Sequence, residues 1–173
     1  YPNVGKQSGA FSSGTYDSDP YILMNFQEDV IEHVFTLAHE AGHSMHTRLS
    51  ADAQPFQYAG YTIFVAEVAS TFNEQLLTRH LLSKAHSPKQ RAAIISREID
   101  AIRGTIIRQT MFAEFERMSH SSVESGEPLT LEKIRTIYRE LLTAYFGSGF
   151  AIDEELELES LRPPPDDDAP APE

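Results

Sequence analysis

Two histidines four residues apart, with a glutamate directly after the first, carry the clearest chemistry in this sequence. They form the segment His39-Glu40-Ala41-Gly42-His43. Imidazoles are common zinc ligands, and a spacing of four residues on a helix places both rings on one face, about one turn apart. Glu40 lies beside this pair, which suits a carboxylate that takes a proton from water without ligating the metal. We therefore interpret His39 and His43 as ligands of one zinc ion and Glu40 as the general base; the competing interpretation is a chance histidine pair on an exposed polar face.

A third ligand is needed, because a catalytic zinc takes three protein ligands and keeps one position for water. The metzincin pattern would require histidine six residues after the second ligand, and Leu49 stands there, so that class is excluded. The best candidate is Glu67 in the next helical segment, which faces the histidines if the connection near Gly60 lets the two helices pack antiparallel. Spacing alone leaves Glu74 and Asp52 as alternative ligands, and an ordinary solvated carboxylate as the competing interpretation of Glu67.

The elements that must position these residues are mostly helices. Apolar residues at i+3 and i+4 spacing predict amphipathic helices over about 29–50, 62–82, 88–120 and 130–146. A β-hairpin is expected over about 9–27, where turn residues precede a short apolar run. Pro88 favours a helix start, and Gly104 is a weak point in the long third helix.

The apolar stripes of these helices predict which side chains are buried. On the first two helices the predicted core residues are Val30, Val34, Leu37, Ala38, Ala41, Met45, Leu49, Val65, Val68, Phe72 and Leu76. The long helix carries Ile95, Ile99, Ile102 and Ile106, and Phe112, Phe115 and Met118 are expected to form a core cluster. The fourth helix is expected to begin after Thr130 and to end at Gly147.

Charge and composition limit the classes of partner. The 173-residue chain has a net charge of −12 and no cysteine, which excludes disulfides and thiolate metal sites. Residues 153–173 account for −8 of that charge, so we predict a catalytic core over 1–152 and a disordered, acidic, Pro-rich tail over 153–173. An acidic body favours binding to neither nucleic acid nor an anionic membrane surface. With no apolar run of membrane length, we expect a soluble, cytoplasmic protein.

Several polar residues near the motif have two interpretations. Glu74 is either an ordinary surface residue or a carboxylate that orients a ligand histidine through its second ring nitrogen. His33 and His46 share the side of the helix that carries the histidine pair, and a surface or supporting role is favoured over substrate contact. Arg103 and Arg108 are expected to form structural ion pairs.

The sequence resembles the oligoendopeptidase F group of the thimet-oligopeptidase family of zinc peptidases. The matching segments are residues 8–26, 39–46, 58–62, 66–74, 103–105 and 108–116, and the resemblance extends over about residues 1 to 161. It implies a mainly helical, zincin-like catalytic domain with a small N-terminal hairpin, in which His39, His43 and Glu67 bind zinc and Glu40 is the base. It also implies hydrolysis of internal bonds in short peptides.

The chain departs from that family pattern at its two ends. It begins at Tyr1 inside the hairpin region, so we expect a piece of a longer peptidase whose remainder is a partner of this core. After Leu161 it continues into Pro163, where the family has a His- and Tyr-bearing segment that holds substrate. The runner-up hypothesis is therefore a zinc-binding but catalytically incompetent fragment, and a third is a metal-free helical domain.

Overall fold

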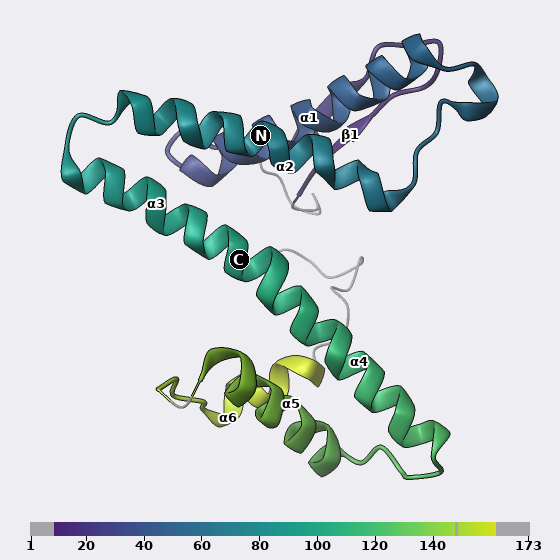
Figure 1. Cartoon of the computed structure of the whole chain (residues 1–173), viewed down its shortest axis with the longest axis vertical. Coiled ribbons are helices and arrows are strands. Elements are labelled where there is room, and N and C mark those ends of the chain that lie inside the picture. The colour runs from purple at the N-terminus through teal and green to yellow at the C-terminus, as the bar shows by residue number, and fades with distance from the viewer. Residues whose placement is uncertain (1–8, 148, 162–173) are drawn as a thin grey trace. The chain divides into compact units, whose positions relative to one another are not determined.

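The fold is mainly helical with one small antiparallel hairpin, as predicted (Figure 1). A computed structural model describes residues 9–147 and 149–161. The chain divides into two compact units, and the boundary falls after Ile94, inside a helix. The predicted disordered region over 162–173 lies outside the described residues. Within the part that is described, no helix is long and apolar enough to cross a membrane.

The hairpin of the first unit pairs β1 (Ala10–Ser13) with β2 (Tyr21–Met24), with Ala10 opposite Met24 and Ser13 opposite Tyr21. Alternation along each strand gives two different faces. One face, which includes Ser12, turns toward the helix that follows, where the Ser12 hydroxyl lies 2.8 Å from that of Ser44.

The two helices that carry the predicted ligands are α1 (Ile31–Ala53) and α2 (Ile63–Lys84). They are joined by η1, the short 3-10 helix Phe56–Tyr58. Side-chain contacts pair early residues of α1 with late residues of α2, so the helices run antiparallel, as expected. Their backbones come closest at Gly42, where an added Cβ would lie 2.7 Å from both the Ala69 carbonyl oxygen and the Ser70 Cα.

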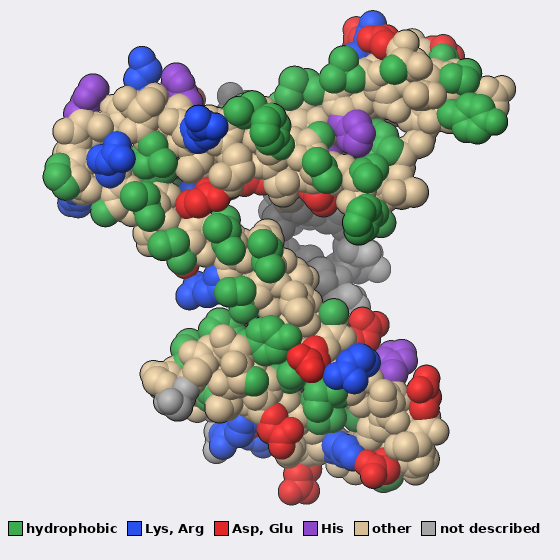
Figure 2. All heavy atoms as spheres, in the orientation of Figure 1, with side chains coloured by type: hydrophobic (Ala, Val, Ile, Leu, Met, Phe, Trp, Pro, Cys, Tyr) green, Lys and Arg blue, Asp and Glu red, His purple; other side chains and the backbone are tan. Residues whose placement is uncertain are grey.

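The predicted core of these two helices is wrong in its details. Leu37, Met45 and Leu49 on α1 are exposed, as are Val65, Val68, Phe72 and Leu76 on α2. The buried positions are Phe35, Glu40, Gly42, Ala66, Ser70 and Thr78. The reason is that the helices meet through small and polar residues, which turns much of the apolar surface outward. Figure 2 shows many hydrophobic side chains on the surface of this unit.

The predicted long helix over 88–120 is three consecutive helical segments. They are α3 (Pro88–Ile102), a π-helical turn η2 (Arg103–Ile107) that contains Gly104, and α4 (Arg108–Glu124). The isoleucines at 95, 99, 102 and 106, whose spacing predicted the helix, are exposed. Arg103 pairs with Asp100, so the structural role expected for it is confirmed.

The second unit has an apolar core between α4 and α5 (Leu131–Phe146). Its buried residues are Met111, Ile137, Tyr138, Leu141 and Leu142, and the predicted cluster of Phe112, Phe115 and Met118 packs against them. The start of α5 agrees with the prediction, because the Thr130 hydroxyl accepts a hydrogen bond from the Lys133 amide. The helix ends at Gly147, whose φ of 81° favours glycine.

The acidic segment after Asp153 differs from the expected disordered tail over the residues that are described. It forms α6 (Glu154–Glu157) and the 3-10 helix η3 (Leu158–Leu161). Glu157 is buried and accepts hydrogen bonds from Arg135 and Arg139. Glu159 pairs with Arg108 and accepts a hydrogen bond from the buried Tyr138 hydroxyl. Composition alone suggested a solvated tail, whereas these carboxylates attach the segment to the second unit through specific arginine partners.

Candidate metal centre

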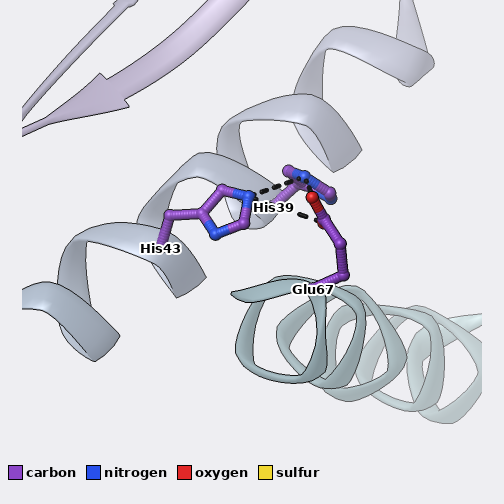
Figure 3. Close-up of side chains that lie close together, drawn as sticks. All are labelled: His39, His43 and Glu67. Atoms are coloured by element: carbon purple, nitrogen blue, oxygen red, sulfur yellow. Dashed lines mark hydrogen bonds and ion pairs between the residues drawn. The ribbon is translucent and has the colours of Figure 1, made fainter. Parts of the chain in front are cut away.

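The two histidines of α1 project side by side. His39 and His43 lie one turn apart on the helix, and their Nε2 atoms are 3.1 Å from each other (Figure 3). Each imidazole is partly exposed, with 27% and 19% of its side-chain surface accessible. The long α1 helix therefore presents two nitrogen ligands at one point, as the spacing predicted.

The carboxylate of Glu67 reaches the same point from α2. Its Oε2 lies 3.3 Å from His39 Nε2 and 3.5 Å from His43 Nε2. Three ligand atoms that each lie about 2.0–2.1 Å from a tetrahedral zinc ion are separated from one another by about 3.3 Å. The donor set and its spacing therefore fit a zinc ion bound by two imidazoles and one carboxylate, with one side of the site left open.

A second carboxylate, that of Glu74, contacts the other ring nitrogen of His39. Glu74 Oε1 lies 2.8 Å from His39 Nδ1. An ionised carboxylate can only accept, so Nδ1 donates, which leaves Nε2 of the neutral ring with its lone pair facing the ligand group. The hydrogen bond to Glu74 raises the pKa of His39, burial opposes this rise, and the charge of Glu67 adds to it. Of the two interpretations of Glu74, the contact with His39 Nδ1 agrees with the one in which this carboxylate orients the ring.

Glu40 is a buried carboxylate next to the histidine pair. It is 7% exposed, in the turn between the two histidines, and its charge contributes to the raised pKa of His39. A general base for water at this site would be expected in such a position, beside the three converging side chains.

Comparison with known proteins gives this arrangement a family. The model of peptidase family M3 matches residues 1–162 of the chain. The chain belongs to peptidase family M3. It is 49% identical to oligopeptidase PepF of Bacillus subtilis and 46% identical to an oligoendopeptidase F homolog of Borreliella burgdorferi, each over 164 residues. These matches include 95% of this chain but only 24% and 28% of the two relatives, so it spans about a quarter of their length.

The fold agrees with this membership. A crystal structure of a "putative peptidase" from Chlamydophila abortus matches with a TM-score of 0.78 and 42% sequence identity. The match covers 92% of this chain and 27% of that one. The mainly helical fold is thus shared with that solved structure over nearly the whole chain.

The alternative third ligands of this M3 chain occupy other places. Asp52 pairs with Arg48 on the surface of α1. Glu74 contacts Nδ1 of His39, whereas the ligand group forms around Nε2. Among the described residues, His39, His43 and Glu67 form the only group of at least three His, Asp or Glu side chains whose ligand atoms converge closely enough for one metal ion.

The two neighbouring histidines support the structure around the site. His33 Nδ1 accepts a hydrogen bond from the Gln27 amide, just before α1 begins. His46 stacks on Tyr61 with ring centroids 3.7 Å apart, and the Tyr61 hydroxyl lies 2.8 Å from that of Thr47. The stack joins α1 to the end of the connection, just before α2 begins, in agreement with the supporting role favoured by the sequence.

Sequence analysis missed three residues that connect the two ligand helices. They are Gly42 at the closest approach, Ser70 beside Glu67, and Asn73, whose side-chain amide donates to the Ala38 carbonyl oxygen. Spacing gave a weak signal for one of them: Ser70 lies three residues after Glu67 and is therefore its neighbour on the surface of α2.

Proposed function

We propose that this chain carries the catalytic centre of a zinc-dependent endopeptidase that hydrolyses internal bonds of short peptides. The observation that carries the proposal is the convergence of two Nε2 atoms and one carboxylate oxygen at separations of 3.1–3.5 Å, with Glu40 buried beside them. The names of the relatives, an oligopeptidase and an oligoendopeptidase homolog, support the substrate class. Family membership supports the reaction type.

In the proposed mechanism, His39, His43 and Glu67 hold the zinc ion, and Glu74 keeps His39 in the tautomer that can bind it. Bound zinc supplies Lewis acidity, which lowers the pKa of water toward about 7 and polarises a peptide carbonyl. Glu40 accepts the proton of the attacking water and then delivers it to the nitrogen of the departing amine. The open side of the site leaves room for the peptide.

The decisive variant is Glu40→Gln, because an amide cannot accept the water proton. Zinc content should stay at one ion per chain while any turnover of a quenched fluorescent peptide is lost. Glu132→Gln makes the same chemical change at an exposed residue of α5 and should alter neither measurement. Turnover that survives in Glu40→Gln would show that another residue is the base.

The ligand assignment has its own test. Glu67→Ala should reduce zinc content strongly, whereas Asp52→Ala, which removes an exposed carboxylate paired with Arg48, should leave it unchanged. Full occupancy in Glu67→Ala would rule out this residue as the third ligand. A parent chain that binds no zinc would favour the metal-free helical domain.

A second candidate function is zinc binding with poor turnover by this chain alone. Peptide hydrolysis needs donors for the developing oxyanion, and removing one typically costs about 10²–10³ in rate. Four tyrosines of the chain could be such donors, but each is engaged elsewhere or exposed. Tyr138 donates to Glu159, Tyr145 donates to Glu114, Tyr61 stacks on His46, and Tyr58 is exposed. We therefore propose that the missing donors lie in the His/Tyr segment of the longer family members.

This second candidate is tested by comparing kcat/KM for the present chain with that for a chain extended by the segment that follows in the M3 relatives. The extension should raise kcat/KM without changing zinc affinity. Equal values for the two chains would show that donors within the present sequence suffice.

We also propose that β2 lines the peptide-binding cleft. The described hairpin has two strands, so one edge of β2 is not paired within it. Both strands also pack on α1, the helix that carries the two histidines. An extended peptide can add to such an edge through main-chain hydrogen bonds. Methylating alternate backbone nitrogens of a peptide substrate should then raise KM, and an unchanged KM would contradict the pairing.

A further inference from the structure

The buried hydroxyl of Ser70 contacts the third ligand directly. Ser70 lies one turn after Glu67 on α2 and is 0% exposed. Its Oγ donates to Glu67 Oε2 at 2.7 Å and also lies 3.1 Å from the Glu67 main-chain oxygen. The hydroxyl has one proton, and the shorter contact goes to the charged acceptor, which is the stronger kind of hydrogen bond. The oxygen that Ser70 holds is the one that faces both histidines.

Helix packing fixes the position of this hydroxyl. The α1 backbone at Gly42 approaches so closely that an added Cβ would lie 2.7 Å from the Ser70 Cα. Ser70 is therefore held between the two helices that supply the ligands. The Glu67 side chain, by contrast, is 51% exposed and has three rotatable bonds. A long, half-exposed side chain loses rotamer freedom when it becomes a ligand, and a fixed donor reduces that loss by holding it in place beforehand.

We propose that Ser70 is a positioning residue for the metal centre: it holds Glu67 Oε2 facing the two histidines, so that a zinc ion meets a preformed set of three ligands. This inference rests on the proposed zinc site and adds a residue that determines its affinity. Serine often bonds only to a main-chain carbonyl one turn earlier, without any role in a site. The neighbouring Thr71 provides that comparison within the same helix, because its hydroxyl donates to the Glu67 main-chain oxygen and is exposed.

The experiment compares Ser70→Ala with Thr71→Ala in the full chain. Each variant removes one hydroxyl that contacts Glu67, but only Ser70→Ala removes a contact with the carboxylate. Zinc affinity is measured by competition with a chromogenic chelator, and the melting temperature of the metal-free chain reports on the fold. We expect Ser70→Ala to weaken zinc binding by about 10–100-fold, the usual effect of losing a partner of a metal ligand. Thr71→Ala should leave the affinity unchanged.

A second measurement separates positioning from a general loss of structure. In a Glu67→Ala background, Ser70→Ala should no longer affect the residual affinity, because its partner is gone. The absorption spectrum of the cobalt-loaded chain should also change in Ser70→Ala and not in Thr71→Ala, since it reports the geometry of the ligands. Equal zinc affinity in Ser70→Ala, Thr71→Ala and the parent would overturn the role of Ser70 while leaving the zinc site intact. A parent chain that binds no zinc would overturn both proposals.

Discussion

The interface of α1 with α2 and the core between α4 and α5 are built in different ways. At the first, backbones meet at Gly42, and the side chains of Asn73 and Glu74 make hydrogen bonds from α2 to α1. The second is a cluster of buried apolar side chains that includes Tyr138 and Leu142. Directional hydrogen bonds and close backbone contact fix positions closely, whereas apolar burial supplies most of the stability of a fold.

The difference shows how this chain positions the side chains of its candidate metal centre. The surface between α1 and α2 fixes the positions of the candidate ligands. Much of the apolar surface of these helices is exposed and contributes to no core. In the second unit, α4 and α5 bury their apolar side chains against each other and form a core. Substitutions should therefore separate the two regions, affecting stability in one and metal binding in the other.

The largest effect on stability is expected from Leu142→Ala in the apolar core. Leu142 is 2% exposed, and truncating a buried leucine costs about 2–5 kcal/mol. Urea unfolding monitored by tyrosine fluorescence should show this loss, while zinc affinity stays unchanged because the cluster and its packed neighbours all lie between residues 111 and 156. Leu131→Ala, at an exposed position of α5, is the control and should change stability little. A joint loss of zinc binding in Leu142→Ala would contradict the separation.

Gly42→Ala should affect both stability and metal binding. The new methyl group would meet main-chain atoms of α2, and such overpacking costs about 1–3 kcal/mol. The helices must move apart, which carries Glu67 away from the histidines and lowers zinc affinity. Gly104→Ala is the matched control, since no atom lies within 4 Å of its added Cβ. Unchanged zinc affinity in Gly42→Ala would mean that the close approach does not set the ligand geometry.

The ion pairs of Glu157 predict a response to acid in the second unit. Burial raises the pKa of this carboxyl, but hydrogen bonds from Arg139 and Arg135 outweigh it and hold the pKa below its ordinary value of 4.5. The unfolded chain then takes up the proton first, so the stabilisation is present above pH 4.5 and is lost as the pH falls through the lower, folded pKa. Melting temperatures measured across this range should fall less steeply for Glu157→Gln. An identical slope would show that these pairs do not contribute.

The smallest effect is expected from Phe72→Gln on the outer surface of α2. Phe72 is 62% exposed, and exposed substitutions usually change stability by within about 0.5 kcal/mol. The same change at Phe35, which is 2% exposed on α1, should be strongly destabilising. Thermal melting of the two variants checks the contrast. A large loss in Phe72→Gln would mean that the apolar surface of α2 is covered in this chain.

The local patterns predicted much of the fold and most of the ligand group. Once the helix was predicted, the i,i+4 spacing put both histidines on one face, and Thr130 and Gly147 marked the ends of α5. Periodicity could not tell which apolar stripe is covered, because that depends on the partner surface, and it placed Phe72 inside. Ser70 was missed for a related reason: a serine three residues after a glutamate is common in helices, and its role appears only when Gly42 brings the other helix against it.

The π-helical turn at Arg103–Ile107 shifts the direction in which side chains of α4 point relative to those of α3. Such a turn holds about one residue more than an α-helical turn, so every side chain after it is rotated by about 100° around the axis. In an unbroken α-helix, Met111 would lie about 160° from Ile95 and about 120° from Ile99; with this rotation, these angles are about 60° and 20°. The apolar surface therefore winds gradually around the axis instead of switching to its opposite side. Deleting one residue from the turn would keep the chain helical but rotate Ile95 and Ile99 by about 100° around the axis relative to Met111 and the α4–α5 core.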